Sequence, residues 1–180
     1  MAAHPQRYSH NQNITLVPFR GEASYMQDAI QIYAEVWHKD AYDSGYMLRQ
    51  YPQFPCFYGV LAQINGYTVG MGFGTAAISG LWWHERVKRE VGDNHPVLQK
   101  AWILTELAVR PQYQNLHIGS RLLTALTDAQ PRRNLLLSTH TDNVAAIRFY
   151  QRHGWWTLHP GFAFHRRGKQ FAILARQHTH

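Results

Sequence analysis

The segment from Ala101 to Leu126 constrains the fold of this chain more than any other, because it reads as a strand, a polar loop and a helix in succession. Residues 103–109 have the apolar density of a buried strand. Arg110-Pro111 ends that strand, since proline fixes φ and offers no N–H to a neighbouring strand. The polar residues 112–115 therefore form a loop that precedes the helix.

The helix that follows carries a candidate anion-binding site at its start. Apolar residues recur once per helical turn over residues 118–129, and Pro131 closes the run. Gly119 falls in the first turn, where a missing side chain lets a ligand come close to the backbone. The first N–H groups of a helix have no partner within it, so they are available to an anion.

The sequence VRPQYQNLHIGSRLL, which contains these residues, resembles the pyrophosphate-binding motif of the GNAT superfamily of acyl-CoA-dependent N-acyltransferases. Gln114 and Gly119 match that motif, whereas His117 stands where the family usually has a glycine. A second family segment is matched by Asn143, Ala146, Phe149-Tyr150 and Gly154-Trp155. Two motifs at the family's spacing are more specific than either alone, and the resemblance covers residues 103–156.

The resemblance implies a GNAT-like single domain of mixed α/β (α+β) class over residues 1–180. Its central twisted mixed sheet is expected to have about seven strands, largely antiparallel with one parallel pair, flanked by about four helices. Residues 1–13 are polar and are predicted to form a flexible N-terminal extension.

Local patterns predict the remaining elements. They are strands over 14–19, 57–64, 67–76, 134–139, 155–158 and 162–175, and helices over 25–37, 42–51 and 143–153. Asn65-Gly66 predicts a tight hairpin turn, because both residues accept a positive φ. Gly70, Gly72 and Gly74 share one face of the second hairpin strand, where we expect close packing.

Several residues are predicted to begin or end these elements. Ser24 is expected to cap the first helix, and either Thr141 or Asp142 the last one. Gly154 is expected to end that last helix in the left-handed conformation. Pro160-Gly161 is predicted to form the turn of the final hairpin.

Charge and composition restrict the partners. The net charge of +7 suits an anionic partner, such as a phosphorylated cofactor, a nucleic acid or an acidic surface. Cys56, the single cysteine, favours a reducing compartment and is predicted to be a buried hydrophobe. The twelve histidines follow no metal-ligand pattern, so no metal is predicted. Without an apolar run of membrane-spanning length or a signal peptide, we expect a cytoplasmic protein with no membrane partner. Whether it forms a homodimer is left open.

The resemblance also implies how acetyl-CoA would bind as a co-substrate. Backbone amides of residues 115–120 are expected to face the pyrophosphate, and residues 107–109 to pair with the pantetheine arm like an added strand. His117 either widens the loop or places its ring on a phosphate. Asn143 either bonds the pantetheine or caps its own helix. The full predicted set is Leu107, Ala108, Val109, Gln114, Asn115, Leu116, His117, Ile118, Gly119, Ser120 and Asn143.

Acyl transfer from a thioester to an amine proceeds by direct attack or through a covalent enzyme intermediate. Cys56 lies far from the cofactor motif and has no patterned partners, which favours direct transfer. Glu106, inside the central strand and on the face opposite Leu107 and Val109, is the candidate base, with an exposed or salt-bridged carboxylate as the alternative. Tyr150 is the candidate acid by resemblance to the family, with a core aromatic as the alternative.

Residues 78–98 form an insertion relative to a minimal acyltransferase. Trp82 and Trp83 lie there beside charged residues, and they either close over an acceptor or belong to a short helix with one buried Trp. Other carboxylates that are candidates for binding the acceptor's cation are Asp40, Asp43 and Glu85.

The sequence therefore predicts an N-acetyltransferase that moves the acetyl group of acetyl-CoA directly to a primary amine of a small molecule or peptide. One alternative is a CoA-binding module without turnover, suggested by His117. The other is an RNA-binding protein whose basic hairpin stacks bases on Phe162, Phe164 or Phe171. The scattered basic residues form no clear nucleic-acid stripe, which disfavours this second alternative.

Overall fold

The computed structural model describes residues 13–178, so the predicted extension at 1–13 lies almost wholly outside the described residues. The strands are β1 (Ile14–Phe19), β2 (Tyr58–Ile64), β3 (Tyr67–Ala76), β4 (Trp102–Val109), β5 (Asn134–His140), β6 (Trp156–Ala163) and β7 (Gln170–Gln177). The helices are α1 (Ala23–Trp37), α2 (Ala41–Leu48), α3 (Trp82–Val91), α4 (Ile118–Asp128) and α5 (Val144–Arg152). Three short 3-10 helices lie at Tyr51–Gln53, Pro96–Leu98 and Pro111–Tyr113.

All seven strands form one sheet in the order β1-β2-β3-β4-β5-β7-β6. Among the described strands only β4 and β5 run parallel, and the other neighbours are antiparallel. The predicted mixed α/β fold is therefore confirmed, with five α-helices where about four were expected.

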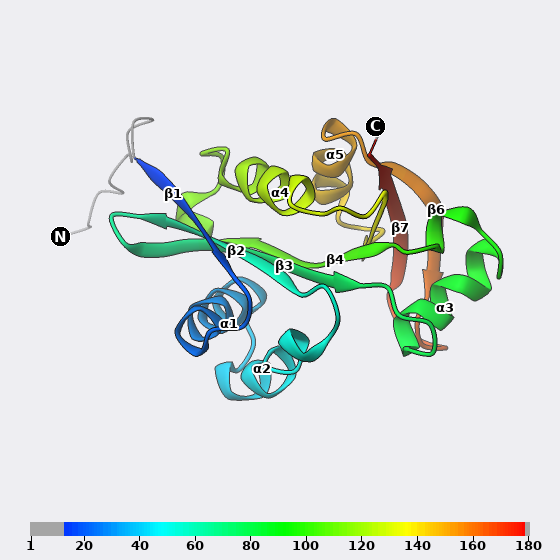
Figure 1. Ribbon diagram of the computed structural model, residues 1–180, viewed down its shortest axis with the longest axis horizontal. Coiled ribbons are helices and arrows are strands. Elements are labelled where there is room, and N and C mark those ends of the chain that lie inside the picture. Colours follow the sequence, from blue (N-terminus) through cyan, green and yellow to red (C-terminus); the bar gives the residue numbers. More distant parts are fainter. Residues whose placement is uncertain (1–12, 179–180) are drawn as a thin grey trace.

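Helices cover both faces of the sheet (Figure 1). On one face α4 packs Leu122 and Leu126 into a core that is closed to solvent. On the other face α1 packs Ile30 against Phe73 of the sheet, again without solvent contact. A third core lies under α3, where Val87 is fully buried against β5, β6 and β7. The layers explain why apolar residues recur once per turn in α4.

The hairpin of β2 and β3 forms as predicted. Asn65 and Gly66 have φ values of +52° and +79°, as a tight turn of two residues requires. A Cβ added to Gly72 would lie 2.6 Å from the side chain of Leu126, and one on Gly74 would collide with the backbone of β4. The glycines of β3 therefore serve close packing.

The predicted helix caps are wrong in two places. No side chain caps α1. The helix begins at Ala23, before Ser24, so Ser24 lies inside its first turn. In α5 the cap is Asn143, whose Oδ1 accepts a hydrogen bond of 3.1 Å from a backbone N–H of the first turn. Thr141 and Asp142 precede the cap and do not fill that role.

The segment between α2 and β2 also differs from its prediction. Helix α2 ends at Leu48, and a separate 3-10 helix follows around Pro52, which cannot donate the N–H that a continuing helix needs. Cys56 is exposed, has a φ of +57° and accepts a hydrogen bond of 3.3 Å from the Arg132 guanidinium. Its prediction as a buried hydrophobe is wrong.

Pro160-Gly161 does not form the final turn. Both residues lie within β6, and residues 164–169 connect β6 to β7. The pairing of β6 with β7 is irregular at this point, and β6 is an edge strand, so the missing N–H of proline breaks no central ladder.

The three phenylalanines of this hairpin pack against one another. Ring centroids are 4.8 Å apart for Phe162 and Phe164 and 4.9 Å apart for Phe164 and Phe171, both edge to face. Phe162 is buried and the other two are half-buried. Since they are occupied by each other, they do not form the open stacking platform that the RNA-binding alternative requires.

The insertion contains the short helix α3, as the second of its two alternatives describes, although neither tryptophan is fully buried. Trp83 is half-buried, and its Nε1 donates a hydrogen bond of 3.1 Å to the Ser138 hydroxyl of β5. Trp82 is 55% exposed. The two neighbouring tryptophans therefore have different surroundings, one within the protein and the other largely at its surface.

Candidate active site

The site begins where β4 and β5 separate. The two strands pair only at the start of β4, through Trp102 and Ile103. From Leu104 onward the edge of β4 that faces β5 has no strand partner, so its backbone N–H and C=O groups are available to an extended ligand.

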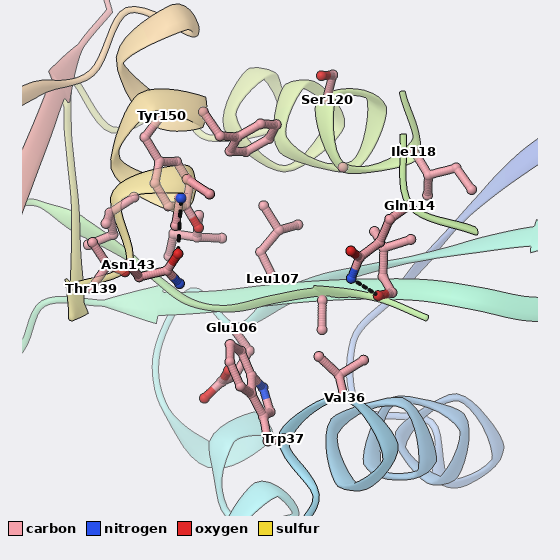
Figure 2. Close-up of a pocket in the computed structure, with 18 of the residues that line it drawn as sticks. Val36, Trp37, Glu106, Leu107, Gln114, Ile118, Ser120, Thr139, Asn143 and Tyr150 are labelled. Atoms are coloured by element: carbon pink, nitrogen blue, oxygen red, sulfur yellow. Dashed lines mark hydrogen bonds between the residues drawn. The ribbon is translucent and has the colours of Figure 1, made fainter. Parts of the chain in front are cut away.

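A β-bulge on the opposite edge of β4 determines where its side chains point. Leu104 pairs with Gly74 and Glu106 pairs with Phe73, so Thr105 is an extra residue in β4. Regular alternation would put Leu104 and Glu106 on the same face. The bulge reverses this, and Figure 2 shows Glu106 on the α1 side of the sheet, beside Trp37.

A cavity of about 1020 Å³ fills the gap between the two strands. It is lined by β4, β5, the starts of α4 and α5 and the end of α1, so it passes from one face of the sheet to the other. The predicted cofactor residues that line it are Leu107, Ala108, Val109, Gln114, Asn115, His117, Ile118, Gly119, Ser120 and Asn143. Leu116 does not line it, because its side chain packs on the core beneath α4.

The start of α4 presents backbone rather than side-chain groups to this cavity. No side chain caps α4, so its first N–H groups lack such a partner. Asn115 and His117 have φ values of +62° and +59°, which is the left-handed conformation that glycine adopts most easily. This explains why a glycine would suit position 117. The exposed His117 adopts the same backbone conformation at some cost.

Gln114 and Gly119 hold the loop and leave space beside it. The Gln114 Nε2 donates a hydrogen bond of 3.1 Å to the Val109 carbonyl at the end of β4 (Figure 2). A Cβ on Gly119 would lie 3.6 Å from the Phe149 ring of α5, so a longer side chain there would enter the space between the two helices.

Asn143 lies at the edge of the same cavity, although its Oδ1 is used as the cap of α5. Its amide nitrogen has no other partner among the described hydrogen bonds and is available to a ligand. Both roles that the sequence suggested are thus compatible. The sequence did not point to Thr139 and His140 at the end of β5, nor to Phe171 of β7 as a residue of this site, and all three line the cavity.

His140 is the most unusual of these unpredicted residues. Its ring centroid lies 4.1 Å from that of Phe171, and its buried Nδ1 has no hydrogen-bond partner. Only its position at the end of the strand that separates from β4 could have indicated it in the sequence.

Glu106 of β4 lines the cavity. No described cation forms an ion pair with its carboxylate, and burial raises its pKa from 4.5 to about 8. A carboxyl group with a pKa near neutral pH can both accept and release a proton there. Its negative charge, after the larger effect of burial, also raises the pKa values of Tyr33, Tyr51 and Tyr150.

Tyr150 approaches from the opposite face of the sheet, on α5. Its ring packs edge to face on Phe149 and Trp155, with centroids 5.2 and 5.8 Å away. Burial raises the pKa of the phenol above its ordinary value, which keeps the proton on its oxygen. The residue is therefore a packed aromatic whose hydroxyl can donate a proton or hydrogen bond into the cavity.

A second cavity of about 380 Å³ adjoins the first. The two share Leu104, Thr105, Glu106 and Ser138, so they adjoin around these residues, of which Glu106 is the charged one. The second cavity is otherwise walled by the 3-10 helix after α2, the end of β3 and the start of α3.

The other predicted carboxylates lie outside both cavities. Asp40 caps α2 by accepting backbone hydrogen bonds of 2.8 and 3.0 Å, and Asp43 lies in the first turn of that helix. Glu85 accepts a hydrogen bond of 2.7 Å from the Gly80 N–H. The structure thus gives Asp40 and Glu85 structural roles at helix starts.

The model of the acetyltransferase (GNAT) family matches residues 23–155, which are nearly three quarters of the chain and include the four residues that the two cavities share. The chain belongs to the GNAT acetyltransferase family. The match spans both motifs recognised in the sequence and confirms the predicted family.

The chain also matches a curated relative at moderate sequence identity. A GCN5-like protein acetyltransferase of Mycobacterium tuberculosis is 30% identical over 122 residues, which are 62% of this chain and 59% of the relative. The match thus spans about three fifths of that relative's length.

Solved structures show the same fold. The ribosomal-protein-S18-alanine N-acetyltransferase of Escherichia coli superposes with a TM-score of 0.64 at 18% identity, covering 92% of this chain and 94% of its own. The yncA protein of Salmonella typhimurium, solved with its cofactor acetyl-CoA, superposes with a TM-score of 0.63 at 14% identity. The match covers 94% of this chain and 96% of the yncA chain.

Two further features of the described residues bear on partners. No helix within residues 13–178 is long and apolar enough to cross a membrane. The same residues contain no group of three or more His, Cys, Asp or Glu side chains placed to hold a metal ion.

Proposed function

We propose that the chain transfers the acetyl group of acetyl-CoA directly to a primary amine. The observation that carries the proposal is that two adjoining cavities are both lined by Glu106, the single acidic residue of either lining among the described residues, which forms no ion pair there. A ternary complex needs this arrangement, because both reactants must reach one point from different directions.

The larger cavity suits acetyl-CoA in two respects. The free edge of β4 at residues 107–109 offers backbone groups to the amide-containing pantetheine arm. The uncapped start of α4 offers N–H groups and the positive end of a helix dipole to the diphosphate. Acetyl-CoA supplies an activated acyl group when bound, and the excess positive charge of the chain favours its phosphates.

Glu106 and Tyr150 are proposed to handle the two protons of the reaction. As the amine nitrogen forms its bond to the acyl carbon, Glu106 takes the proton that the nitrogen loses. As the carbon–sulfur bond breaks, the Tyr150 hydroxyl donates a proton to the departing sulfur. The two groups reach the cavity from opposite faces of the sheet (Figure 2), and the reacting centre is proposed to lie between them.

Direct transfer is proposed over a covalent enzyme intermediate. The single cysteine, Cys56, lines neither cavity, and its sulfur accepts a hydrogen bond from the Arg132 guanidinium. No thiol is therefore placed to carry the acetyl group.

The names of the relatives bear on the acceptor. The mycobacterial relative is called a protein acetyltransferase, and the Escherichia coli structure is that of an enzyme for an alanine of a ribosomal protein. These names support an amine as the acceptor, of a protein or of a smaller molecule.

The proposal is tested by calorimetry with acetyl-CoA and by thiol release on a panel of amines. We expect binding of acetyl-CoA, and release of CoA with at least one amine. Binding without release on any amine would instead support the CoA-binding module.

A pair of substitutions on α4 tests the location of the cofactor. Gly119→Glu puts a carboxylate between α4 and α5 and is expected to weaken acetyl-CoA binding about tenfold or more by charge repulsion. Thr124→Glu adds the same charge to an exposed position on the same helix, outside the cavity, and should leave binding within about twofold. Equal effects of the two variants would argue against the proposed position of the phosphates.

A further inference from the structure

The inserted helix α3 is fixed firmly against the sheet. Val87 is fully buried, and Trp83 donates its hydrogen bond to Ser138. Arg86 forms an ion pair with Glu90, and donates a hydrogen bond of 2.9 Å to the Ala163 carbonyl of β6. These contacts hold the first turn of α3 in one position beside the smaller cavity.

Trp82, in that first turn, contributes little to this attachment. Its ring stacks on His165 with centroids 5.3 Å apart and lies 5.0 Å from Phe164, and more than half of the residue is exposed. It nevertheless lines the smaller cavity. A large exposed aromatic that lines a cavity and is little used in the core is suited to contact a ligand.

The walls of the smaller cavity are mostly apolar and aromatic, and its polar lining residues are Thr75, His84, Thr105, Glu106 and Ser138. Its apolar and aromatic lining residues are Tyr51, Phe54, Ala76, Ile78, Leu81, Trp82, Trp83, Ile103 and Leu104. Glu106 is the only acidic residue among the described residues that line either cavity. The cavity can therefore neutralise one positive charge, at the point where the two cavities meet.

The surroundings of Trp82 disfavour further positive charge. His165, on which Trp82 stacks, begins an exposed turn that also carries Arg166, Arg167 and Lys169. A second ammonium group on the acceptor would lie near these cations or against apolar walls, and both arrangements are unfavourable.

We propose that the acceptor is a primary monoamine with an aromatic or apolar body. The body occupies the cavity between Trp82 and the Tyr51–Phe54 segment, and the amino group reaches Glu106. The volume of about 380 Å³ lies near the lower end of the range for small-molecule pockets, which suits a compact arylalkylamine. This assignment rests on the proposed acetyl transfer and names its acceptor class.

The test compares kcat/KM for four acceptors: 2-phenylethylamine, n-butylamine, spermidine and a lysine-containing peptide blocked at its N-terminus. We expect 2-phenylethylamine to exceed each of the others about tenfold or more, because burial of an aromatic ring distinguishes it from a shorter or more charged amine.

Substitution of Trp82 tests the contact itself. Trp82→Ala is expected to raise KM for 2-phenylethylamine about tenfold with little change in kcat, and Trp82→Phe should restore most of the loss. Trp156→Ala is the matched control, since Trp156 is a 42% exposed tryptophan that lines neither cavity. Melting temperature and acetyl-CoA affinity, measured on each variant, should stay at the values of the unsubstituted protein.

The possible results separate the acceptor class from the reaction. Faster turnover of spermidine or of the lysine peptide, or equal effects of Trp82→Ala and Trp156→Ala, overturns the aromatic monoamine while acetyl transfer stands. Acetyl-CoA binding without thiol release on any of the four amines overturns the proposed reaction and this assignment together.

Discussion

The two cavities that meet at Glu106 are built in different ways. The larger one takes its binding groups from the backbone, namely the unpaired edge of β4 and the uncapped start of α4. The smaller one takes them from side chains, above all the aromatic residues of α3 and of the segment after α2. Backbone groups depend on how the strands and helices are arranged, whereas the aromatic side chains depend on which residues stand at these positions.

The difference predicts how the two sides respond to substitution. In the larger cavity, a side-chain substitution matters when it blocks space, adds charge or changes the conformation of the loop. In the smaller cavity, each aromatic residue contributes its own contact surface to binding. Glu106 belongs to both sides, so its substitution should have the largest effect, and changes in the loop before α4 the smallest.

The largest effect is expected for Glu106→Gln. The amide has nearly the same shape but cannot accept the proton of the amine, so kcat should fall about 10²–10⁴-fold. Calorimetry should give an acetyl-CoA affinity within about threefold of the unsubstituted protein, because the cofactor contacts are made by the backbone.

The pH dependence supplies the control for this variant. In the unsubstituted protein kcat/KM should rise with pH up to about 8, where Glu106 loses its proton. If the residual kcat/KM of Glu106→Gln still rose with pH in the same way, another group would be responsible for the pH dependence, and Glu106 would not be the base.

Tyr150→Phe should have a smaller effect. Thiolates are good leaving groups, so loss of the proton donor is expected to lower kcat by about tenfold, within the lower part of what acid catalysis contributes. The ring contacts with Phe149 and Trp155 remain, and the melting temperature should change little. A kcat equal to that of the unsubstituted protein would leave Tyr150 with a packing role alone.

The buried carboxyl group should also be visible in stability. Because the folded-state pKa of Glu106 is about 8 and the ordinary value is 4.5, the folded state binds the proton more tightly between these pH values. The protonated Glu106 carboxyl group therefore makes its full contribution to the free energy of unfolding below pH 4.5, and this contribution is lost as the pH rises towards 8. Glu106→Gln should melt at a higher temperature than the unsubstituted protein at pH 9, with the difference shrinking towards pH 5, as measured by calorimetric scans at each pH.

The smallest effect is expected for His117→Gly. Glycine adopts the φ of +59° at this position without strain, so the variant should be at least as stable as the unsubstituted protein. Acetyl-CoA affinity should change less than about threefold if backbone groups supply the contacts. A loss of tenfold or more would show instead that the imidazole touches a phosphate.

The elements of the proposed cofactor side could be predicted from the sequence because their signals are local. Strand 103–109, the proline after it and the apolar spacing of α4 lie within one short segment and indicate the strand, the loop and the helix, whereas the anion site at the start of α4 stays a prediction. The helix caps and the end of α2 were missed by errors of a few residues, whereas the turn predicted at Pro160-Gly161 failed because of distant neighbours. Pro160-Gly161 has the composition of a turn, yet it fits within β6 because that strand lies at the edge of the sheet.

The sequence by itself determined the family, the order of the elements apart from α3, the residues at the start of α4 and the face of β4 on which Glu106 lies, since each follows from spacing along the chain. The tertiary structure alone decided that Glu106 and Leu104 point to opposite faces of the sheet, and which segments surround Glu106. The first depends on the bulge between β3 and β4 at Thr105, and the second on α3, which is held by β5 and β6. Both are set by pairing and packing between segments far apart in the chain, and no local pattern of residues records those contacts.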